Sequence, residues 1–358
     1  MNGAVIALTA QGGTLALEIG AKTGFTVYLP EGHCPPECPA LCYRSLRETF
    51  MECFTTKRAL VLVMATGIAV RLLAPLIRSK LSDPAVVVMD ERGQYAVSLL
   101  SGHWGGANDL AWQLGEAIGA IPVITTATDV NELQAVDVFA REYGLMPEPF
   151  SGIKQLNAAM LRGETVVVFT EEDVEQSPKG NLLFQPLADF SKLSRIYFYR
   201  AIITHQTIFT DAGENDVYLR PPVLYVGVGC RRGISAERIL EAVTGVLSGY
   251  NLAPSSVAGL ASIDKKSDEP GLLKAAETLR VPLFFYSADE INSLTVPYQT
   301  SNFVQKNMGV GAVCEPVAML AASSDQLLVP KQNLNGITVA VAKGRFPWSA
   351  WGRERNGH

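Results

Sequence analysis

Residues 101–109 read SGHWGGAND and place a histidine in a loop rich in glycine. An imidazole with a pKa of about 6.5 exchanges protons at neutral pH, which suits His103 to acid–base chemistry. Glycines leave room for backbone N–H groups to approach a ligand, and the N-terminus of a following helix favours an anion or a developing oxyanion. The candidate substrate contacts in this loop are Gly102, Gly105 and Gly106.

Asn108 lies in the same stretch and is taken with His103 as a candidate catalytic residue. The alternative is a tight strand-to-helix turn with an exposed histidine, in which Asn108 or Asp109 caps the helix. The residues alone leave both interpretations open.

A second glycine loop, residues 227–233, reads GVGCRRG between a predicted strand and a predicted helix. Its spacing differs by one residue from the dinucleotide fingerprint, and Asp264 follows about 30 rather than about 20 residues later, so a nicotinamide site is not favoured. Arg231 and Arg232 instead indicate binding of carboxylates or phosphates, which a guanidinium grips with two hydrogen bonds. Cys230 could be a nucleophile, but a small, half-buried cysteine is the favoured interpretation.

A charged loop, residues 262–271, reads SIDKKSDEPG and follows the next predicted strand. Lys265 and Lys266 are expected at the same sheet edge as the arginine pair, where they could bind a polyanion; a solvated loop is the alternative. Asp264 and Glu315 are candidate carboxylate bases should His103 not act. Gly67 and Arg71, in a turn and the helix after it, complete the candidate substrate contacts.

Cys34, Cys38 and Cys42 lie among prolines with the spacing C-x3-C-x3-C. This spacing matches neither zinc sites nor the ferredoxin runs, so it predicts a loop with free thiols and no metal. The chain has six cysteines in 358 residues without a regular framework, which favours a reducing cytoplasm.

Apolar runs and helical patterns alternate along most of the chain, as in parallel sheets covered by helices. They predict an α/β protein with two α/β domains, whose mostly parallel sheets are flanked by helices, joined by a smaller and irregular α+β middle region. The predicted boundaries are 1–138, 139–222 and 223–343, with a tail at 344–358.

Composition excludes several classes of protein. With 48% hydrophobic residues and a net charge of −5, the chain is globular and a poor general binder of nucleic acid or anionic membranes. The N-terminus lacks a basic region ahead of its short apolar run, so no signal peptide is expected. Residues 59–77 are apolar enough to span a membrane, but a Thr-Gly pair, Arg71 and Pro75 fit a strand, a turn and a helix better.

Four motifs occur in order: SGHWGGAN, VGVGCRRGIS, ASIDKKSDEPGLLKAAETL and GVGAVCEPVAMLAA. Together they resemble the cobalt-precorrin-5A hydrolase family of the anaerobic cobalamin pathway. The resemblance runs from about the first residues to about Lys343 and leaves out the tail and the cysteine loop.

The resemblance implies a cobalt-bearing, ring-contracted tetrapyrrole substrate with a δ-lactone. Water opens the lactone, and a two-carbon unit leaves as acetaldehyde to give cobalt-precorrin-5B. It implies no added cofactor, because the substrate carries the cobalt, and no partner beyond the tetrapyrrole and transient contacts with neighbouring pathway enzymes. The family's C-terminal module also resembles stand-alone proteins of the oxygen-dependent route, where acetaldehyde is not released, so the chemistry is assigned to the N-terminal domain.

Two other classes stay open at this point. A non-catalytic tetrapyrrole carrier would use the same cations to hold the substrate's carboxylates. A nucleotide-dependent enzyme would use the glycine loops for phosphates, but neither loop is followed by the Gly-Lys-Ser/Thr of a P-loop.

Overall fold

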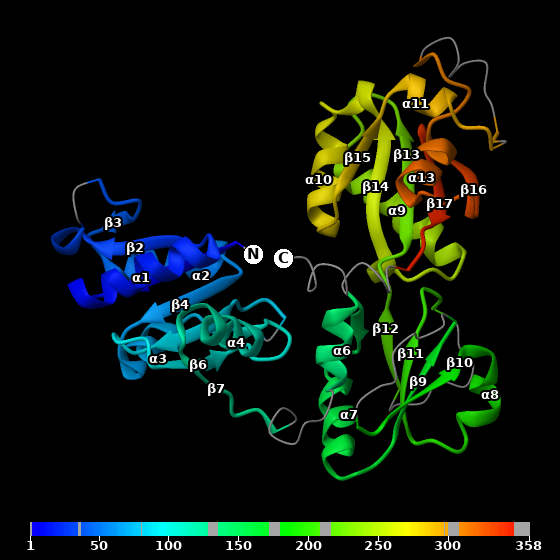
Figure 1. Cartoon of the computed structure of the whole chain (residues 1–358). Helices are drawn as coiled ribbons and strands as arrows, with labels where there is room; N and C mark the ends of the chain where they lie inside the picture. The colour runs from blue at the N-terminus through cyan, green and yellow to red at the C-terminus, as the bar shows by residue number, and fades with distance from the viewer. Residues whose placement is uncertain are drawn as a thin grey trace. The chain divides into compact units, whose positions relative to one another are not determined.

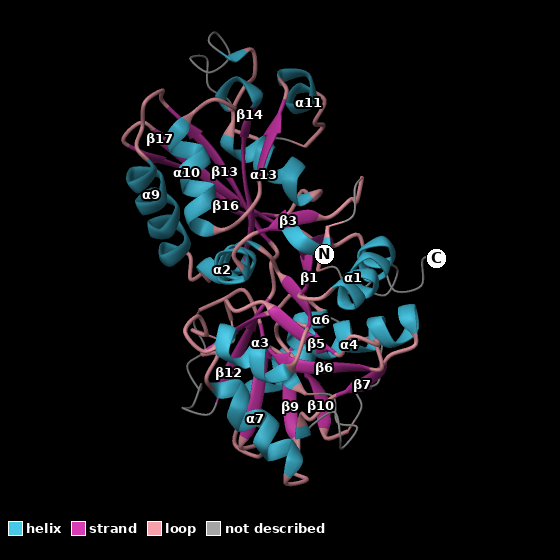
Figure 2. Ribbon diagram, turned by 90° about the vertical axis from the view of Figure 1, so that its left-hand side faces the viewer, coloured by secondary structure: helices cyan, strands magenta, loops and turns pink. Residues whose placement is uncertain are grey.

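The computed structural model describes residues 2–34, 37–79, 81–127, 135–171, 180–207, 216–296, 298–299 and 308–346 (Figure 1). The internal contacts divide the chain into an N-terminal unit, Met1–Val138, and a C-terminal unit, Phe139–His358. The predicted domain boundaries at 138, 222 and 343 stay predictions. The fold class is α/β as predicted, with helices flanking each sheet (Figure 2).

The N-terminal unit is built on a seven-stranded sheet with the order β3-β2-β1-β4-β5-β6-β7. Its strands are β1 (Gly3–Ala7), β2 (Thr26–Pro30), β3 (Leu41–Tyr43), β4 (Ala59–Val63), β5 (Ala85–Met89), β6 (Tyr95–Leu100) and β7 (Ile121–Val123). The strands from β3 to β5 are parallel, whereas β6 is antiparallel to β5 and β7 is parallel to β6. The cause is the short connection at Asp90–Gly93, since a tight hairpin can join only antiparallel strands.

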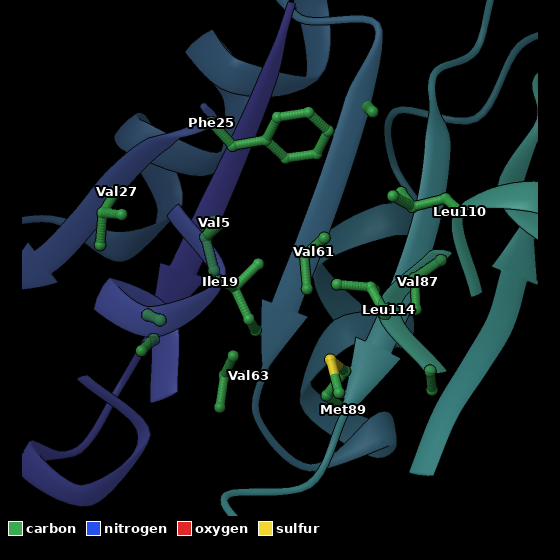
Figure 3. Packing of buried hydrophobic residues seen from close by; sticks show 14 of the residues in the cluster. Val5, Ile19, Phe25, Val27, Val61, Val63, Val87, Met89, Leu110 and Leu114 are labelled. Atoms are coloured by element: carbon green, nitrogen blue, oxygen red, sulfur yellow. The ribbon is translucent and has the colours of Figure 1, made fainter. Parts of the chain in front are cut away.

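Helices cover both faces of this sheet. They are α1 (Ala10–Thr23), α2 (Leu46–Thr56), α3 (Thr66–Leu73) and α4 (Ala107–Ile118), with the 3₁₀ helix η1 (Glu31–His33) after β2. Ile19 of α1 and Leu110 and Leu114 of α4 pack against alternate strand residues such as Val61 and Val87 (Figure 3). Residues of α2 and α3 bury the opposite face.

The apolar stretch 59–77 is divided between β4 and α3, as its sequence predicts. Among the described residues, no helix has the length and the apolar character to cross a membrane.

The middle of the chain is more regular than its sequence predicts. Its strands are β8 (Met146–Glu148), β9 (Val166–Thr170), β10 (Leu182–Pro186), β11 (Tyr199–Ile203) and β12 (Asp216–Arg220). They form a sheet of order β10-β9-β11-β12-β8 in which only β8 is antiparallel to its neighbour. The helices are α6 (Val136–Glu142), α7 (Gly152–Leu161), η2 (Leu187–Asp189) and α8 (Phe190–Leu193). Residues 172–179 and 208–215 of this region lie outside the described residues.

The last part of the chain forms a sheet of order β15-β14-β13-β17-β16. Its strands are β13 (Leu224–Cys230), β14 (Val257–Ile263), β15 (Leu283–Tyr286), β16 (Leu327–Leu334) and β17 (Ile337–Lys343). The helices are α9 (Ala236–Gly249), η3 (Pro254–Ser256), η4 (Asp264–Lys266), α10 (Pro270–Leu279), α11 (Ala288–Asn292) and α13 (Cys314–Ala322). β13, β14 and β15 are parallel, so their carboxyl ends share one edge.

Candidate functional site

The glycine loop around His103 joins β6 to α4. Its glycines are needed for its shape: a Cβ on Gly102 would lie 2.7 Å from Oδ1 of Asn108, a Cβ on Gly105 would collide with Ser101, and Gly106 has a φ of 90°. The amides of Ala107 and Asn108 donate to the carbonyls of Ser101 and Gly102. The loop therefore satisfies the first amides of α4 itself, and an oxyanion here would have to use other donors.

His103 contacts a carboxylate that the sequence did not single out. Its Nδ1 lies 3.2 Å from Oδ2 of Asp137, in the first turn of α6, and the two side chains are 13% and 14% exposed. A proton on Nδ1 donates to this carboxylate and places the lone pair on Nε2, which is the tautomer of a general base. No sequence signal marks Asp137, because the contact joins residues 34 positions apart.

Asn108 has a structural role in this loop. The residue is 5% exposed; its amide group donates to the hydroxyl of Thr126 at 2.9 Å, and its carbonyl accepts from the hydroxyl of Ser98 at 2.7 Å. Gly106, rather than Asn108 or Asp109, is the cap of α4. A catalytic role for Asn108 stays a prediction.

The reversal of β6 separates the candidate residues of the N-terminal unit. Leu100 pairs with Val86 at the start of β5, so the His103 loop lies at the amino edge of the parallel strands. Gly67 and Arg71 belong to α3, which follows the carboxyl end of β4. The His103 loop does follow the carboxyl end of its own strand, as expected, but because β6 is antiparallel to β5 this loop lies at the opposite edge from the carboxyl ends of β4 and β5.

The structure brings Arg231, Arg232, Asp264 and Lys265 together at the carboxyl edge of β13 and β14. Arg232 donates to the carbonyl of Lys265 at 3.2 Å and pairs with the carboxylate of Asp268 at 3.1 Å, and this hydrogen bond lowers the pKa of Asp268. Both arginines and Lys265 are exposed. Within the part of the chain that is described, the guanidinium of Arg231 has no hydrogen-bond partner, so it is the cation best placed to take a carboxylate.

Lys266 and Glu315 differ from the predictions made for them. Lys266 is 3% exposed and pairs with Glu269 at 3.1 Å, while the other carboxylate oxygen of Glu269 accepts from the amide of Gly233 at 2.8 Å. Glu315 is 1% exposed, and its carboxylate accepts from the amides of Gln299 and Lys331 at 2.7 and 2.8 Å. Buried and fully engaged, Lys266 holds its loop rather than a ligand, and Glu315 connects α13 to two other segments rather than serving as an accessible base.

The glycines of the second loop serve packing. Gly227 lies so close to the carbonyl of Cys314, at the start of α13, that a Cβ would collide with it. A Cβ on Gly229 would lie 2.5 Å from the hydroxyl of Thr338 on β17. Gly227 therefore makes room for the backbone of α13, and Gly229 for the side chain of Thr338, rather than for a pyrophosphate. Burial raises the pKa of the Cys230 thiol, which fits its interpretation as an inert cysteine.

The cysteine loop contains a disulfide between Cys34 and Cys42, with Cα atoms 6.1 Å apart. The prediction of free thiols is therefore wrong for these two residues, whose Cα separation suits a bridge. Cys38 is free and half-buried. Among the described residues, no three side chains of His, Cys, Asp or Glu are grouped to hold a metal ion.

His205 lies in a small cavity of about 10 Å³ within the C-terminal unit, lined also by Glu171, Thr204 and Lys343. The residue is 5% exposed, and burial, with help from Lys343 and Arg220, lowers the pKa of its imidazole to about 4 against the opposing charge of Glu171. The imidazole is therefore neutral at pH 7.

We expect His205 to make the folded state less stable as the pH falls. Its pKa is lower in the folded than in the unfolded protein, so its contribution is complete above about pH 6.5 and is lost as the pH approaches 4. Between pH 7 and 4.5 the loss should be about 2–3 kcal/mol. Urea unfolding at both pH values measures it. The variant His205→Gln should lose less stability over this range by that amount, and an equal loss in both proteins would contradict the assignment.

We expect Arg231→Ala to weaken substrate binding by about 1.5–3 kcal/mol, the range for a hydrogen bond to a charged group. Arg232→Ala should cost less, because Arg232 is already paired with Asp268. Arg280→Ala is the matched control, since Arg280 caps the far end of α10 at the opposite edge of the same sheet. Equilibrium titration with substrate gives the affinities; equal values for Arg231→Ala and Arg280→Ala would remove Arg231 from the site.

Three family descriptions match successive parts of the chain. Residues 48–129 match the N-terminal region of cobalamin synthesis protein G, residues 134–221 match a cobalamin biosynthesis central region, and residues 224–342 match the C-terminus of cobalamin synthesis protein G. His103, Gly67 and Arg71 lie within the first match, and the cysteine loop lies before it.

Relatives match over nearly the whole chain. A cobalt-precorrin-5A hydrolase from Priestia megaterium is 31% identical over 95% of this chain and 94% of its own length. One from Salmonella typhimurium is 35% identical over 94% of this chain and 96% of its own. A solved cobalamin biosynthesis protein G homologue from Sulfolobus solfataricus covers 96% of this chain and 97% of its own, with 23% identity and a TM-score of 0.41.

Proposed function

The chain belongs to the cobalt-precorrin-5A hydrolase family, and from this membership we propose that it opens the δ-lactone of cobalt-precorrin-5A with water and releases a two-carbon unit as acetaldehyde. The observation that carries this activity is the match to two such hydrolases over at least 94% of the chain. The product is cobalt-precorrin-5B. The reaction needs no further cofactor, because cobalt is part of the substrate.

The chemistry needs proton transfers at two stages. Water adds to the lactone carbonyl and loses a proton, and the released ring oxygen gains one to become an alcohol. The alcohol then loses its proton, the bond between the alcohol carbon and the macrocycle breaks, and its electron pair takes up a proton on the macrocycle. An imidazole can perform each transfer in turn, and the contact of His103 with Asp137 supports its assignment to this role.

The substrate's carboxylates require cations, which an acidic protein must supply locally. Arg231, Arg232 and Lys265 gather at one sheet edge and are proposed to bind carboxylates in the C-terminal unit, while Arg71 is proposed for the N-terminal unit. Lys266 is left out, because it is buried with Glu269. A cytoplasmic location and transient contacts with neighbouring pathway enzymes stay part of this proposal.

Anaerobic incubation of the purified protein with cobalt-precorrin-5A tests the activity. Acetaldehyde, trapped as its hydrazone, should appear in proportion to substrate consumed over many turnovers. A non-catalytic carrier would bind the tetrapyrrole and return it unchanged. Substrate recovered intact from a protein that binds it would overturn the proposal in favour of the carrier.

A further inference from the structure

The N-terminal unit contains an open cavity of about 400 Å³ at the carboxyl edge of its parallel strands. Met64 follows β4, Thr66 begins α3, and Tyr95 and Val97 come from the first half of β6. The volume lies in the range of small-molecule sites, and the carboxyl edge is where open α/β sheets bind their ligands. No residue proposed above for catalysis lines this cavity.

The cavity exists because α3 is short. α3 has eight residues and packs against β5 and the end of β6, so among the described residues it leaves the start of β6 and the neighbouring β7 uncovered on this face. Tyr95 and its cross-strand partner Ile121 are 48% and 58% exposed, although α1 and α4 bury the other face of the same sheet. Tyr95 and Val97 of β6 thus line the cavity with an aromatic ring and an aliphatic side chain.

The charges around the cavity favour an apolar occupant with its anionic groups outside. Asp90 is already engaged, because its carboxylate accepts from the amides of Arg92 and Tyr95 at 2.9 and 2.8 Å. Glu91, also on the lining, adds negative charge that repels carboxylates. The guanidinium of Arg71 lies beside Gly67, whose carbonyl it reaches at 3.1 Å, one residue from Thr66.

We infer that this cavity binds the apolar face of a flat macrocycle, with Tyr95 stacked on the ring and Arg71 holding one peripheral carboxylate. The occupant is the tetrapyrrole ring of the substrate, and this identification rests on the proposed function. Aromatic stacking and burial of flat apolar area supply the affinity. β6 runs from the cavity at Tyr95 to the His103 loop beyond Leu100, so the cavity and this loop lie at opposite ends of one strand.

Thr66→Trp tests the inference by filling the cavity. Binding is measured by absorbance titration with cobalt uroporphyrin, a stable, carboxylated cobalt tetrapyrrole, and KM is measured with cobalt-precorrin-5A. Thr66→Trp should raise both the Kd and the KM at least tenfold. Thr55→Trp is the matched control: Thr55 is exposed on α2, and its hydroxyl bonds only carbonyls of its own helix. The control should bind as the wild type does.

A second variant keeps the inference testable if Thr66→Trp fails to fold. Tyr95→Ser removes the ring from an exposed position and should raise the Kd three- to tenfold, while Tyr95→Phe, which keeps the ring, should bind as the wild type does. A wild-type Kd for cobalt uroporphyrin in folded Thr66→Trp and Tyr95→Ser proteins would overturn the inference, whether or not the wild type is a hydrolase. Conversely, a wild type that binds the probe through this cavity but releases no acetaldehyde would overturn only the proposed function.

Discussion

Replacing His103 by alanine should lower the rate of acetaldehyde release about 10²–10⁴-fold, the scale for loss of an acid–base group. His103→Gln should be nearly as slow, since glutamine forms hydrogen bonds but exchanges no proton at neutral pH. Asp137→Asn should also reduce turnover, because the tautomer with its lone pair on Nε2 loses its carboxylate partner. Substrate affinity should change little in all three.

Single-turnover release of acetaldehyde measures these effects without interference from product dissociation. His33→Ala is the matched control, since His33 is an exposed histidine in η1 of the same unit. Near-wild-type release by His103→Ala would remove the residue from the mechanism. Asp264 would then be the carboxylate to test, because it is exposed at the arginine edge, whereas Glu315 is buried against backbone amides.

Lys266→Met should lower the free energy of unfolding by about 3–5 kcal/mol, because it leaves the buried carboxylate of Glu269 without its counter-ion. Lys274→Met should cost well under about 1 kcal/mol. Lys274 and Glu277 have the same three-residue spacing as Lys266 and Glu269, but their side chains are 62% and 70% exposed, against 4% and 2% for the buried pair.

Urea unfolding of the two variants gives this comparison directly. Equal stability of Lys266→Met and Lys274→Met would contradict the structural role of Lys266. It would also return Lys266 to the candidate substrate contacts.

Local sequence patterns predicted the order of strands and helices, because each of these elements depends mainly on its own residues. Alternating strands and helices predicted the α/β class and placed Arg231, Arg232 and Lys265 at one edge, because parallel strands bring their carboxyl ends together. Residues 90–93, DERG, form a local turn. Its consequence, the antiparallel β6 that carries the His103 loop to the opposite edge, depends on how strands pair and was missed.

Long-range contacts account for the other differences. Asp216 is a charged residue that is nevertheless buried at the start of β12, because its carboxylate pairs with Arg200, its cross-strand neighbour on β11. Lys266 was predicted to bind a polyanion, with a solvated loop as the alternative, but it is buried in an environment that the folded loop forms and its neighbours in sequence do not. The Cys34–Cys42 disulfide was missed because the cysteine spacing matches no standard disulfide or metal-binding pattern. The contact of Asp137 with His103 was missed because it forms only when the chain folds.

The contact between Gly227 and α13 connects the interior of the C-terminal sheet to the carboxyl edge that carries the arginine pair. The segment leading into α13 includes Met308, whose carbonyl accepts from Nζ of Lys265, beside the arginine pair. A single methyl group at position 227 would push against the backbone of Cys314 and, through the helix, shift this segment. A Gly227→Ala substitution, made deep in the sheet, would therefore displace the exposed cations at the sheet edge, although position 227 does not contact them.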